Sequence, residues 1–321
     1  MILFLKAQVN VFKTTILSGV LLAIIGHALI GVSLIWDKVL LQRKGTQNLF
    51  SYVFWLGAIS IFGLFLMPFG FAFPGLQLAA TGLLAGVLDL VASYFYYSAL
   101  KSGEASEELA AMGGFVPVAT ALISVPLLKH PFGEHVSGFL LMTVGGFIMF
   151  FAEQKPLKKM LPKIVLASVA FGLSDVLQKL AFNGSGFVTG YVFFTLGTFV
   201  AAVALLIPPS WRRQIWASSG TKDKPRSQFW YFVNRFVAGV GSFLVVFAVS
   251  KASPALVEAI SGVRYVIIFI GAYAITQWKP SWFKEDFRRW ALVTKATATS
   301  LVIFGLVLVG IQGGRGNSGP P

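Results

Sequence analysis

Long apolar runs follow one another along the whole chain, separated by short connections rich in Pro, Gly and Lys. A helix that crosses a bilayer needs roughly 20 mainly apolar residues, and its backbone polar groups pair within the helix. The pattern therefore predicts an all-α transmembrane protein with ten helices and little material for a soluble domain. The expected spans are residues 15–41, 49–70, 76–100, 107–128, 136–152, 164–182, 188–207, 231–250, 256–277 and 290–310.

Four short patterns recur in the same order about half a chain apart, which predicts two repeats. They are WDK at 36–38 with QK at 178–179, YVFWLG at 52–57 with YVFFTLG at 191–197, AS at 105–106 with AS at 252–253, and Glu134 with Glu285. Because each half holds an odd number of spans, the second half is inverted in the membrane, as in many secondary transporters. We expect a first five-helix repeat at 1–152, a basic linker at 153–163, a second five-helix repeat at 164–310 and a flexible Gly-rich tail at 311–321.

Composition limits the chemistry that this chain can carry. Of its 321 residues 56% are hydrophobic and only 12% are charged, whereas about a quarter of the residues in soluble domains are charged. The absence of cysteine excludes disulfides, thiolate metal sites and a cysteine nucleophile. Of the three histidines only His27 lies in an apolar run, so we expect neither a metal site nor a cofactor.

The formal net charge of +14 comes largely from Lys and Arg in the connections, so we expect contacts with anionic lipid headgroups and none with nucleic acid. Sixteen of the 26 Lys and Arg residues lie in the connections that follow odd-numbered spans, and five lie on the opposite side. Connections with excess positive charge stay in the cytoplasm. The count predicts that the polar basic loop 208–230 is cytoplasmic and that both termini face outward, in a protein of the plasma membrane.

Several motifs resemble those of EamA-type members of the drug/metabolite transporter superfamily, and the resemblance covers nearly the whole chain. The motifs are DK at 37–38 followed by LL at 40–41, YYSAL at 96–100, GEAS at 103–106, Pro117, and Glu134 before a Gly-rich helix. The resemblance implies a ten-helix carrier of small metabolites. Its cavity would lie between the two halves and be lined by helices one, three, four, six, eight and nine. Many relatives are expected to keep both termini inside, which disagrees with the charge count, and here we follow the charge count.

Charged residues within the spans are the main candidates for function, since such a group at mid-membrane costs at least ~2.5–3.5 kcal/mol and usually faces a cavity or a partner. Asp89 lies near the middle of the third span. At helical spacing it shares a face with small or polar residues, namely Gly82, Gly86, Ser93 and Tyr96. This stripe is either a cavity wall with a proton or cation site, or a helix-packing face on which Asp89 forms a fixed salt bridge.

The ninth span carries a second group of polar residues: Glu258, Ser261, Arg264 and Tyr265. An arginine can hold a carboxylate or phosphate through two parallel hydrogen bonds, so Arg264 is a candidate anchor for a negatively charged substrate group. The alternative is that Arg264 forms a buried ion pair with Asp89 or Asp175 on a facing helix.

Three further features have a structural and a functional interpretation. Asp175 and Lys179 are four residues apart in the sixth span, which favours a mutual ion pair over a role in substrate binding. His27 sits between small neighbours, which favours a packing histidine over a proton relay. Glu107 and Glu108 open the fourth span, where acids favour a helix N-terminus.

A secondary transporter that works by alternating access explains the repeat and the intramembrane charges together. A membrane-embedded enzyme acting on lipids or peptides would need a nucleophile–base pair or a metal, and the spans offer neither. A channel or a non-transporting scaffold is a further alternative, without a visible ring of like charges. The expected substrate is an amino acid, an organic anion or a nucleotide-linked metabolite, moved by a monomer or a homodimer in contact with membrane lipids.

Overall fold

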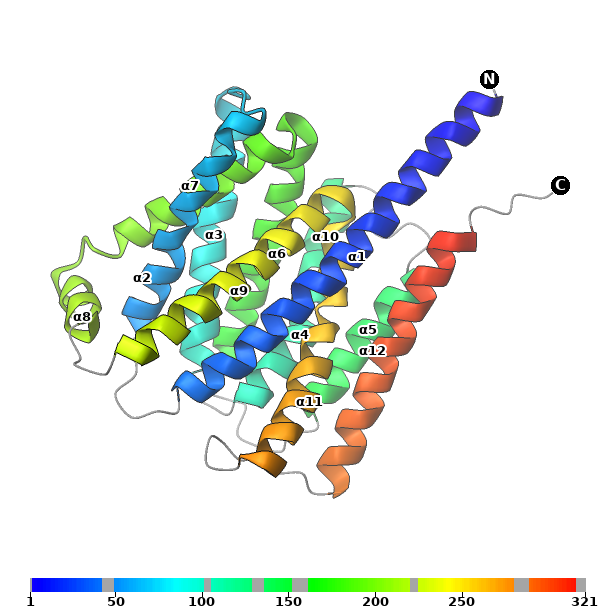
Figure 1. Cartoon of the computed structure of the whole chain (residues 1–321). Coiled ribbons are helices and arrows are strands. Elements are labelled where there is room, and N and C mark those ends of the chain that lie inside the picture. Colours follow the sequence, from blue (N-terminus) through cyan, green and yellow to red (C-terminus); the bar gives the residue numbers. More distant parts are fainter. Residues whose placement is uncertain are drawn as a thin grey trace.

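The computed structural model describes residues 2–41, 49–100, 105–128, 136–151, 161–219, 225–279 and 289–315. All regular secondary structure in these ranges is helical (Figure 1). The elements are α1 Ile2–Leu41, α2 Leu49–Ile59, the 3₁₀ helix η1 Ser60–Phe69, α3 Leu76–Leu100, α4 Ala105–Leu128, α5 Val136–Phe151, α6 Leu161–Ser185, α7 Phe187–Ala204, α8 Pro209–Ser219, α9 Pro225–Lys251, α10 Pro254–Ile260, α11 Gly262–Trp278 and α12 Arg289–Arg315.

Eight helical segments of the described chain are long and apolar enough to cross a membrane, so this is an all-helical multi-pass membrane protein. They are Ser18–Asp37, Leu49–Phe69, Leu76–Ala99, Leu161–Ser185, Phe187–Ala204, Phe232–Lys251, Pro254–Trp278 and Leu292–Val309. Two shorter apolar stretches, Gly114–Leu128 in α4 and Val136–Ile148 in α5, fall where the fourth and fifth spans are expected. Glu134 and Glu285, the last of the four recurring patterns, lie outside the described residues.

Two of the expected continuous spans are interrupted in the structure. The second span is α-helical only to Ile59 and continues as η1, which contains Pro68 and ends at Gly70 with φ of 112°. The ninth span is divided at Ser261 into α10 and α11. There the Ser261 amide donates to the Glu258 carbonyl, and the Arg264 amide donates to the Ser261 carbonyl. These three-residue turns are tighter than those of an α-helix, and apolar periodicity alone cannot reveal them.

The expected loop 208–230 is largely helical, because it holds α8 and the beginning of α9. Helix α8 lies against α2, where Ile215 is buried and the Trp211 ring stacks on Phe50 at 4.9 Å. Its other face exposes Arg212 and Arg213. Aromatic and basic side chains on one short helix suit the membrane–water interface. Helices also extend past three other expected boundaries: α1 begins at Ile2, α6 begins inside the expected linker, and α12 continues to Arg315 in the expected tail.

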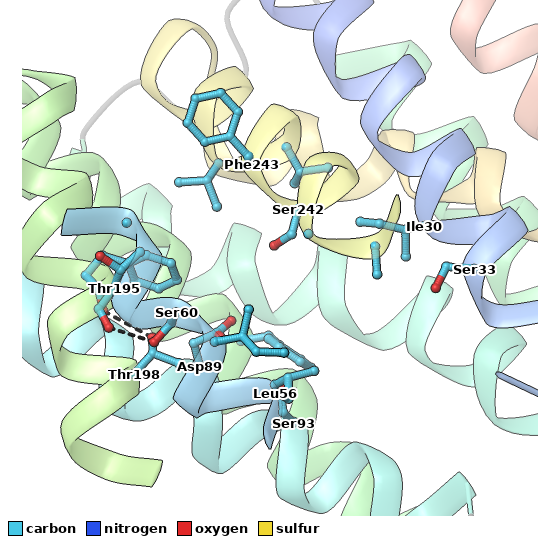
Figure 2. Close-up of a pocket in the computed structure, with 18 of the residues that line it drawn as sticks. Ile30, Ser33, Leu56, Ser60, Asp89, Ser93, Thr195, Thr198, Ser242 and Phe243 are labelled. Carbon is cyan, nitrogen blue, oxygen red and sulfur yellow. Dashed lines mark hydrogen bonds between the residues drawn. The ribbon is translucent and has the colours of Figure 1, made fainter. Parts of the chain in front are cut away.

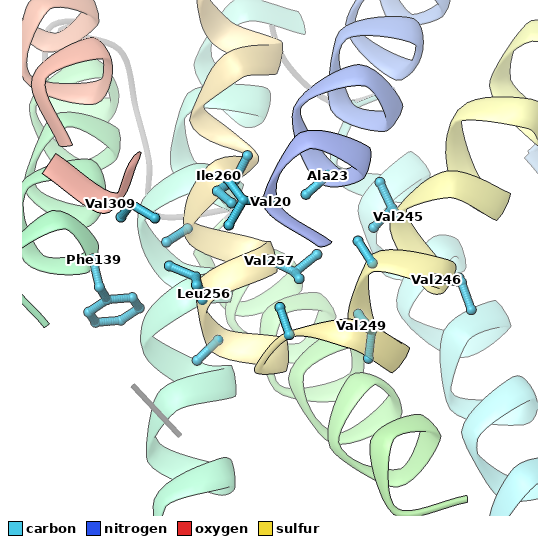
Figure 3. Packing of buried hydrophobic residues seen from close by; sticks show 14 of the residues in the cluster. Val20, Ala23, Phe139, Val245, Val246, Val249, Leu256, Val257, Ile260 and Val309 are labelled. Atoms are coloured by element: carbon cyan, nitrogen blue, oxygen red, sulfur yellow. The ribbon is translucent and has the colours of Figure 1, made fainter. Parts of the chain in front are cut away.

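The helices form a bundle in which α1 lies along α9, α3 along α6 and α7, and α5 along α12 (Figure 1). A buried apolar cluster surrounds α10 (Figure 3). Val257 and Ile260 of α10 are fully buried in it, and they pack among the buried side chains of Val20 of α1, Val249 of α9 and Val309 of α12. Lipid tails are as apolar as these side chains, so close packing, more than removal from water, stabilises the cluster.

Candidate functional site

A cavity of about 560 Å³ lies inside the bundle. Its walls include the helices that the family resemblance implies, here α1, α3, α4, α6, α9 and the α10–α11 pair, and α2, η1 and α7 also contribute. In Figure 2, Leu56 and Ser60 project from the α2–η1 segment on one side, whereas Ser242 and Phe243 belong to α9 on the other. The cavity therefore lies between this part of the α2–η1 segment and α9, and the two elements meet elsewhere, at Tyr52 and Arg235.

This cavity is lined by most of the site residues that were expected from the sequence. They are Asp89, Ser93, Tyr96, Asp175, Glu258, Ser261 and Arg264. Lys179 is the exception, and the side chain of Tyr265 lies outside the described part of the structure. Four different helices thus bring together residues that are far apart in the sequence.

The polar stripe of α3 is partly a helix-packing face and partly a cavity wall, which were the two alternatives expected for it. Its glycines face α7: a Cβ on Gly86 would stand 1.9 Å from the Phe194 carbonyl oxygen, and the Thr198 hydroxyl donates to the Gly86 carbonyl at 3.2 Å. Asp89 and Ser93 face the cavity (Figure 2). Among the described residues Asp89 forms no salt bridge, so the glycines pack and the acid lines the site.

Lys179 does not form the expected ion pair with Asp175. Its ammonium group donates to the carbonyl oxygens of Val249 and Ser250, both at 3.0 Å, in the last turn of α9. The last carbonyls of a helix have no partner within the helix, and a cation there also meets the negative end of the helix dipole. Sequence spacing found a neighbour for Lys179 within α6, but the end of α9 supplies the better acceptors.

Arg264 meets a neutral histidine in place of the acid that was the alternative partner. The Arg264 Nε–H donates to His27 Nδ1 at 2.8 Å, and His27 Nε2 lies 2.9 Å from the Val257 carbonyl oxygen. Since Nδ1 accepts and a carbonyl cannot donate, the ring proton is on Nε2 and His27 is neutral. His27 is fully buried. It holds the Arg264 side chain without cancelling its charge, a role that its small neighbours did not predict.

A second charged cluster in the cavity wall escaped the sequence analysis. Arg235 of α9 forms a salt bridge with both carboxylate oxygens of Asp37 on α1. The Tyr52 hydroxyl donates to Asp37 Oδ2 at 2.9 Å, and the Asn234 amide donates to Oδ1 at 2.6 Å. The Arg235 guanidinium also lies 4.9 Å from the centre of the Tyr52 ring. Opposite charges in two separate spans were the available signal for this pair.

The charges around the cavity do not balance. Asp37 and Arg235 neutralise each other, and Lys179 is bound to backbone carbonyls outside the lining. Three carboxyl groups remain, those of Asp89, Asp175 and Glu258, against one guanidinium, that of Arg264. Within the described ranges no three His, Asp or Glu side chains come close enough together to hold a metal ion. The cavity can thus offer a ligand several acidic groups and one cation.

Comparisons with known proteins define the fold and nothing finer. The sequence matches no family profile and no curated protein. A solved structure titled "Crystal structure of protein" superposes with a TM-score of 0.60 at 15% sequence identity, over 94% of this chain and 99% of that one. At this identity the likeness concerns the fold alone. Fold and composition together define the class, an all-helical multi-pass membrane protein.

Proposed function

We propose that this protein is a secondary active transporter that moves a small metabolite across the plasma membrane by alternating access. Its ten spans would form two inverted repeats of five helices. One observation carries the proposal: two helix pairs that would be equivalent in such a fold differ, since α3 packs closely on α7, whereas the cavity lies between Leu56 and Ser60 of the α2–η1 segment and Ser242 of α9.

The packing of the helices supports the repeat. Exchange of the two halves would place the first span, α1, on the sixth, α6, and the third span, α3, on the eighth, α9. The pairs α1–α9 and α3–α6 would then be equivalent, and both pairs pack extensively. The pair α4–α6 likewise corresponds to the contact of α1 with α10 and α11. The fifth and tenth spans, α5 and α12, would exchange with each other, and they lie side by side (Figure 1).

The difference between the two remaining pairs has a direct mechanical meaning. In an inverted repeat the α3–α7 and α2–α9 contacts would lie toward opposite sides of the membrane. A carrier that exposes its site alternately closes one contact and opens the other as its halves rock. Here the α3–α7 contact is closed by glycine packing, and the α2–α9 contact is open at the cavity. Opening α3–α7 while closing α2–α9 would present the same cavity to the other side.

The groups in the cavity support binding more than catalysis. A hydrolytic enzyme needs a base that can take a proton from a nucleophile. Both ring nitrogens of His27, the single intramembrane histidine, are already hydrogen-bonded to Arg264 and Val257. Arg264 keeps its charge beside the cavity, so in this proposal it binds a carboxylate or phosphate group of the substrate.

The first test combines ligand discovery with transport. A thermal-shift screen of the purified protein against a metabolite library identifies ligands, because a ligand that binds only the folded protein raises its melting temperature. The ligand is then offered, radiolabelled, to vesicles that contain the protein and to protein-free vesicles. We expect saturable uptake that preloaded unlabelled ligand accelerates. Binding without uptake in either direction of an imposed gradient would contradict the transporter proposal.

The variant Arg264→Gln tests whether Arg264 binds a carboxylate or phosphate group of the substrate. We expect normal expression and melting temperature, with affinity for carboxylate-bearing or phosphate-bearing ligands reduced at least about tenfold, equivalent to roughly 1.4 kcal/mol. Ser300→Ala, an exposed position on α12, is the control and should change neither property. If Arg264→Gln is destabilised and its folded fraction transports with unchanged affinity, Arg264 is structural.

A further inference from the structure

We propose that α3, α6 and α10 form a subsite for a protonated amine, built from the carboxyl groups of Asp89, Asp175 and Glu258 and the side-chain oxygen of Gln178. The subsite deepens the proposed function, on which it rests, by naming a chemical group of the transported ligand. It differs from the Arg264 anchor in the sign of the charge that it takes. Its four members all line the cavity.

Gln178 presents a buried acceptor that lacks a donor. Its side chain is only 2% exposed, and its Nε2 donates to the Ser174 hydroxyl oxygen at 3.1 Å. The Ser174 hydroxyl donates its one proton to the Ala85 carbonyl at 2.8 Å, so toward Gln178 it can only accept. The amide orientation is therefore determined, and Oε1 is the atom left over. This oxygen is buried and has no hydrogen-bond partner in the described structure.

Asp175, on the same helix, presents a second buried acceptor that lacks a donor. Its Oδ2 is buried and also lacks a hydrogen-bond partner among the described residues. Asp175 and Gln178 are three residues apart in α6, so their side chains project from one face of that helix. Buried acceptors without donors cost free energy, and in native proteins they are rare. Two of them in one cavity wall indicate a ligand that brings hydrogen-bond donors.

The surrounding charges specify the kind of donor. Asp175 lies close enough to Asp89 and Glu258 for their carboxyl groups to repel one another when ionised, and Arg264, which attracts Asp175 and Glu258, is one cation against three acids. Charges of the same sign interact strongly in a site of low dielectric constant. An organic anion would add to this repulsion, whereas an ammonium group supplies a positive charge and three N–H donors. A protonated amine would therefore donate hydrogen bonds to the two unpaired oxygens and also compensate the negative charge of the carboxyl groups.

Three probes that share the isobutyl group of leucine separate the amine from the carboxylate: isopentylamine lacks the carboxylate, 4-methylpentanoate lacks the amine, and L-leucine has both. We expect isopentylamine and leucine to raise the melting temperature of the detergent-solubilised protein and 4-methylpentanoate to raise it less than leucine. Asp175→Asn should lower the affinity for isopentylamine at least about tenfold while the ligand-free protein melts no lower than wild type, because the change removes a repelled charge. Gln178→Leu should also lower the affinity for isopentylamine, and Gln178→Glu should restore that affinity.

Asp223→Asn is the matched control, since it makes the same chemical change in the connection between α8 and α9, and it should leave amine binding unchanged. Absence of binding by isopentylamine, or equal binding by Asp175→Asn, would overturn the subsite. So would stabilisation by Na⁺ or by acidic buffer with no further effect of the amine. Leucine uptake into vesicles is measured separately: amine binding with the expected variant pattern but without uptake leaves the subsite standing and defeats the transporter proposal.

Discussion

Two arginines of the cavity wall have opposite surroundings, although the sequence places both in apolar spans. Arg235 faces the Asp37 carboxylate, which two further donors, Tyr52 and Asn234, hold in place. Arg264 faces neutral His27. A guanidinium that is paired in this way contributes to the contact between α1 and α9, whereas one held by a neutral group keeps its charge for a ligand. The chemistry of the partner, more than burial, separates a structural arginine from a binding one.

The Arg235–Asp37 pair predicts a large stability effect. Arg235→Gln leaves the Asp37 carboxylate buried without its cation, which typically costs about 3–5 kcal/mol. We expect a clearly lower melting temperature in detergent. The double variant Asp37→Asn with Arg235→Gln should recover most of the loss, because no uncompensated charge remains. An Arg235→Gln variant that melts like wild type would show that the pair has no structural role.

Breaks in the helices occur where elements reach the cavity. The α-helix of the second span ends just before Ser60, and the ninth span is divided at Ser261, and both residues line the cavity. The Ser60 hydroxyl lies 2.9 Å from the Thr195 carbonyl, which ties η1 to α7. Irregular backbone at membrane depth is tolerated where it is covered by protein or lines a cavity. The breaks thus belong to the site, and Glu258 and Arg264 lie on either side of the break at Ser261.

The close contact between α3 and α7 predicts a contrast between two glycines. A Cβ on Gly86 would overlap the Phe194 carbonyl oxygen, whereas a Cβ on Gly239 of α9 would meet nothing within 4 Å. Gly86→Ala should therefore separate the two helices and lower stability by about 1–3 kcal/mol or more. Gly239→Ala adds the same methyl group and should not lower the melting temperature. Equal melting temperatures for both variants would contradict this account of the contact.

At the scale of the whole molecule, the first and last helices bring both ends of the described chain to the same end of the bundle (Figure 1). An even number of membrane crossings would produce this arrangement. Helix α8, with exposed Arg212 and Arg213, belongs to the connection that carries the most positive charge. If the positive-inside rule holds, α8 lies on the cytoplasmic surface and both termini lie outside.

Cysteine labelling tests this orientation directly, because the sequence contains no cysteine. Ser219→Cys, at the end of α8, should resist a membrane-impermeant maleimide on intact cells and react after permeabilisation. Asn317→Cys, near the C-terminus, should react on intact cells. The opposite pattern at both positions would place the termini in the cytoplasm and show that the charge count misassigns this chain.

From the sequence alone, the membrane-spanning segments and the candidate polar residues within them could be predicted. Both are local properties: an apolar run of sufficient length inserts as a helix, and a charge within it must find a cavity or a partner. For that reason Asp89, Asp175, Glu258 and Arg264 could be singled out without a structure, and all four line one cavity.

Which of these groups come into contact depends on the tertiary fold. Arg264 contacts His27 across 237 positions of sequence, and Arg235 contacts Asp37 across 198. Such pairings depend on how each helix is rotated and how closely its neighbours approach, and the spacing of residues along one helix contains no information on either. The breaks at Ser60 and Ser261 could not be predicted because the expected spans continue through both positions, and the hydrogen bond from Ser60 to Thr195 of α7 depends on how the helices pack.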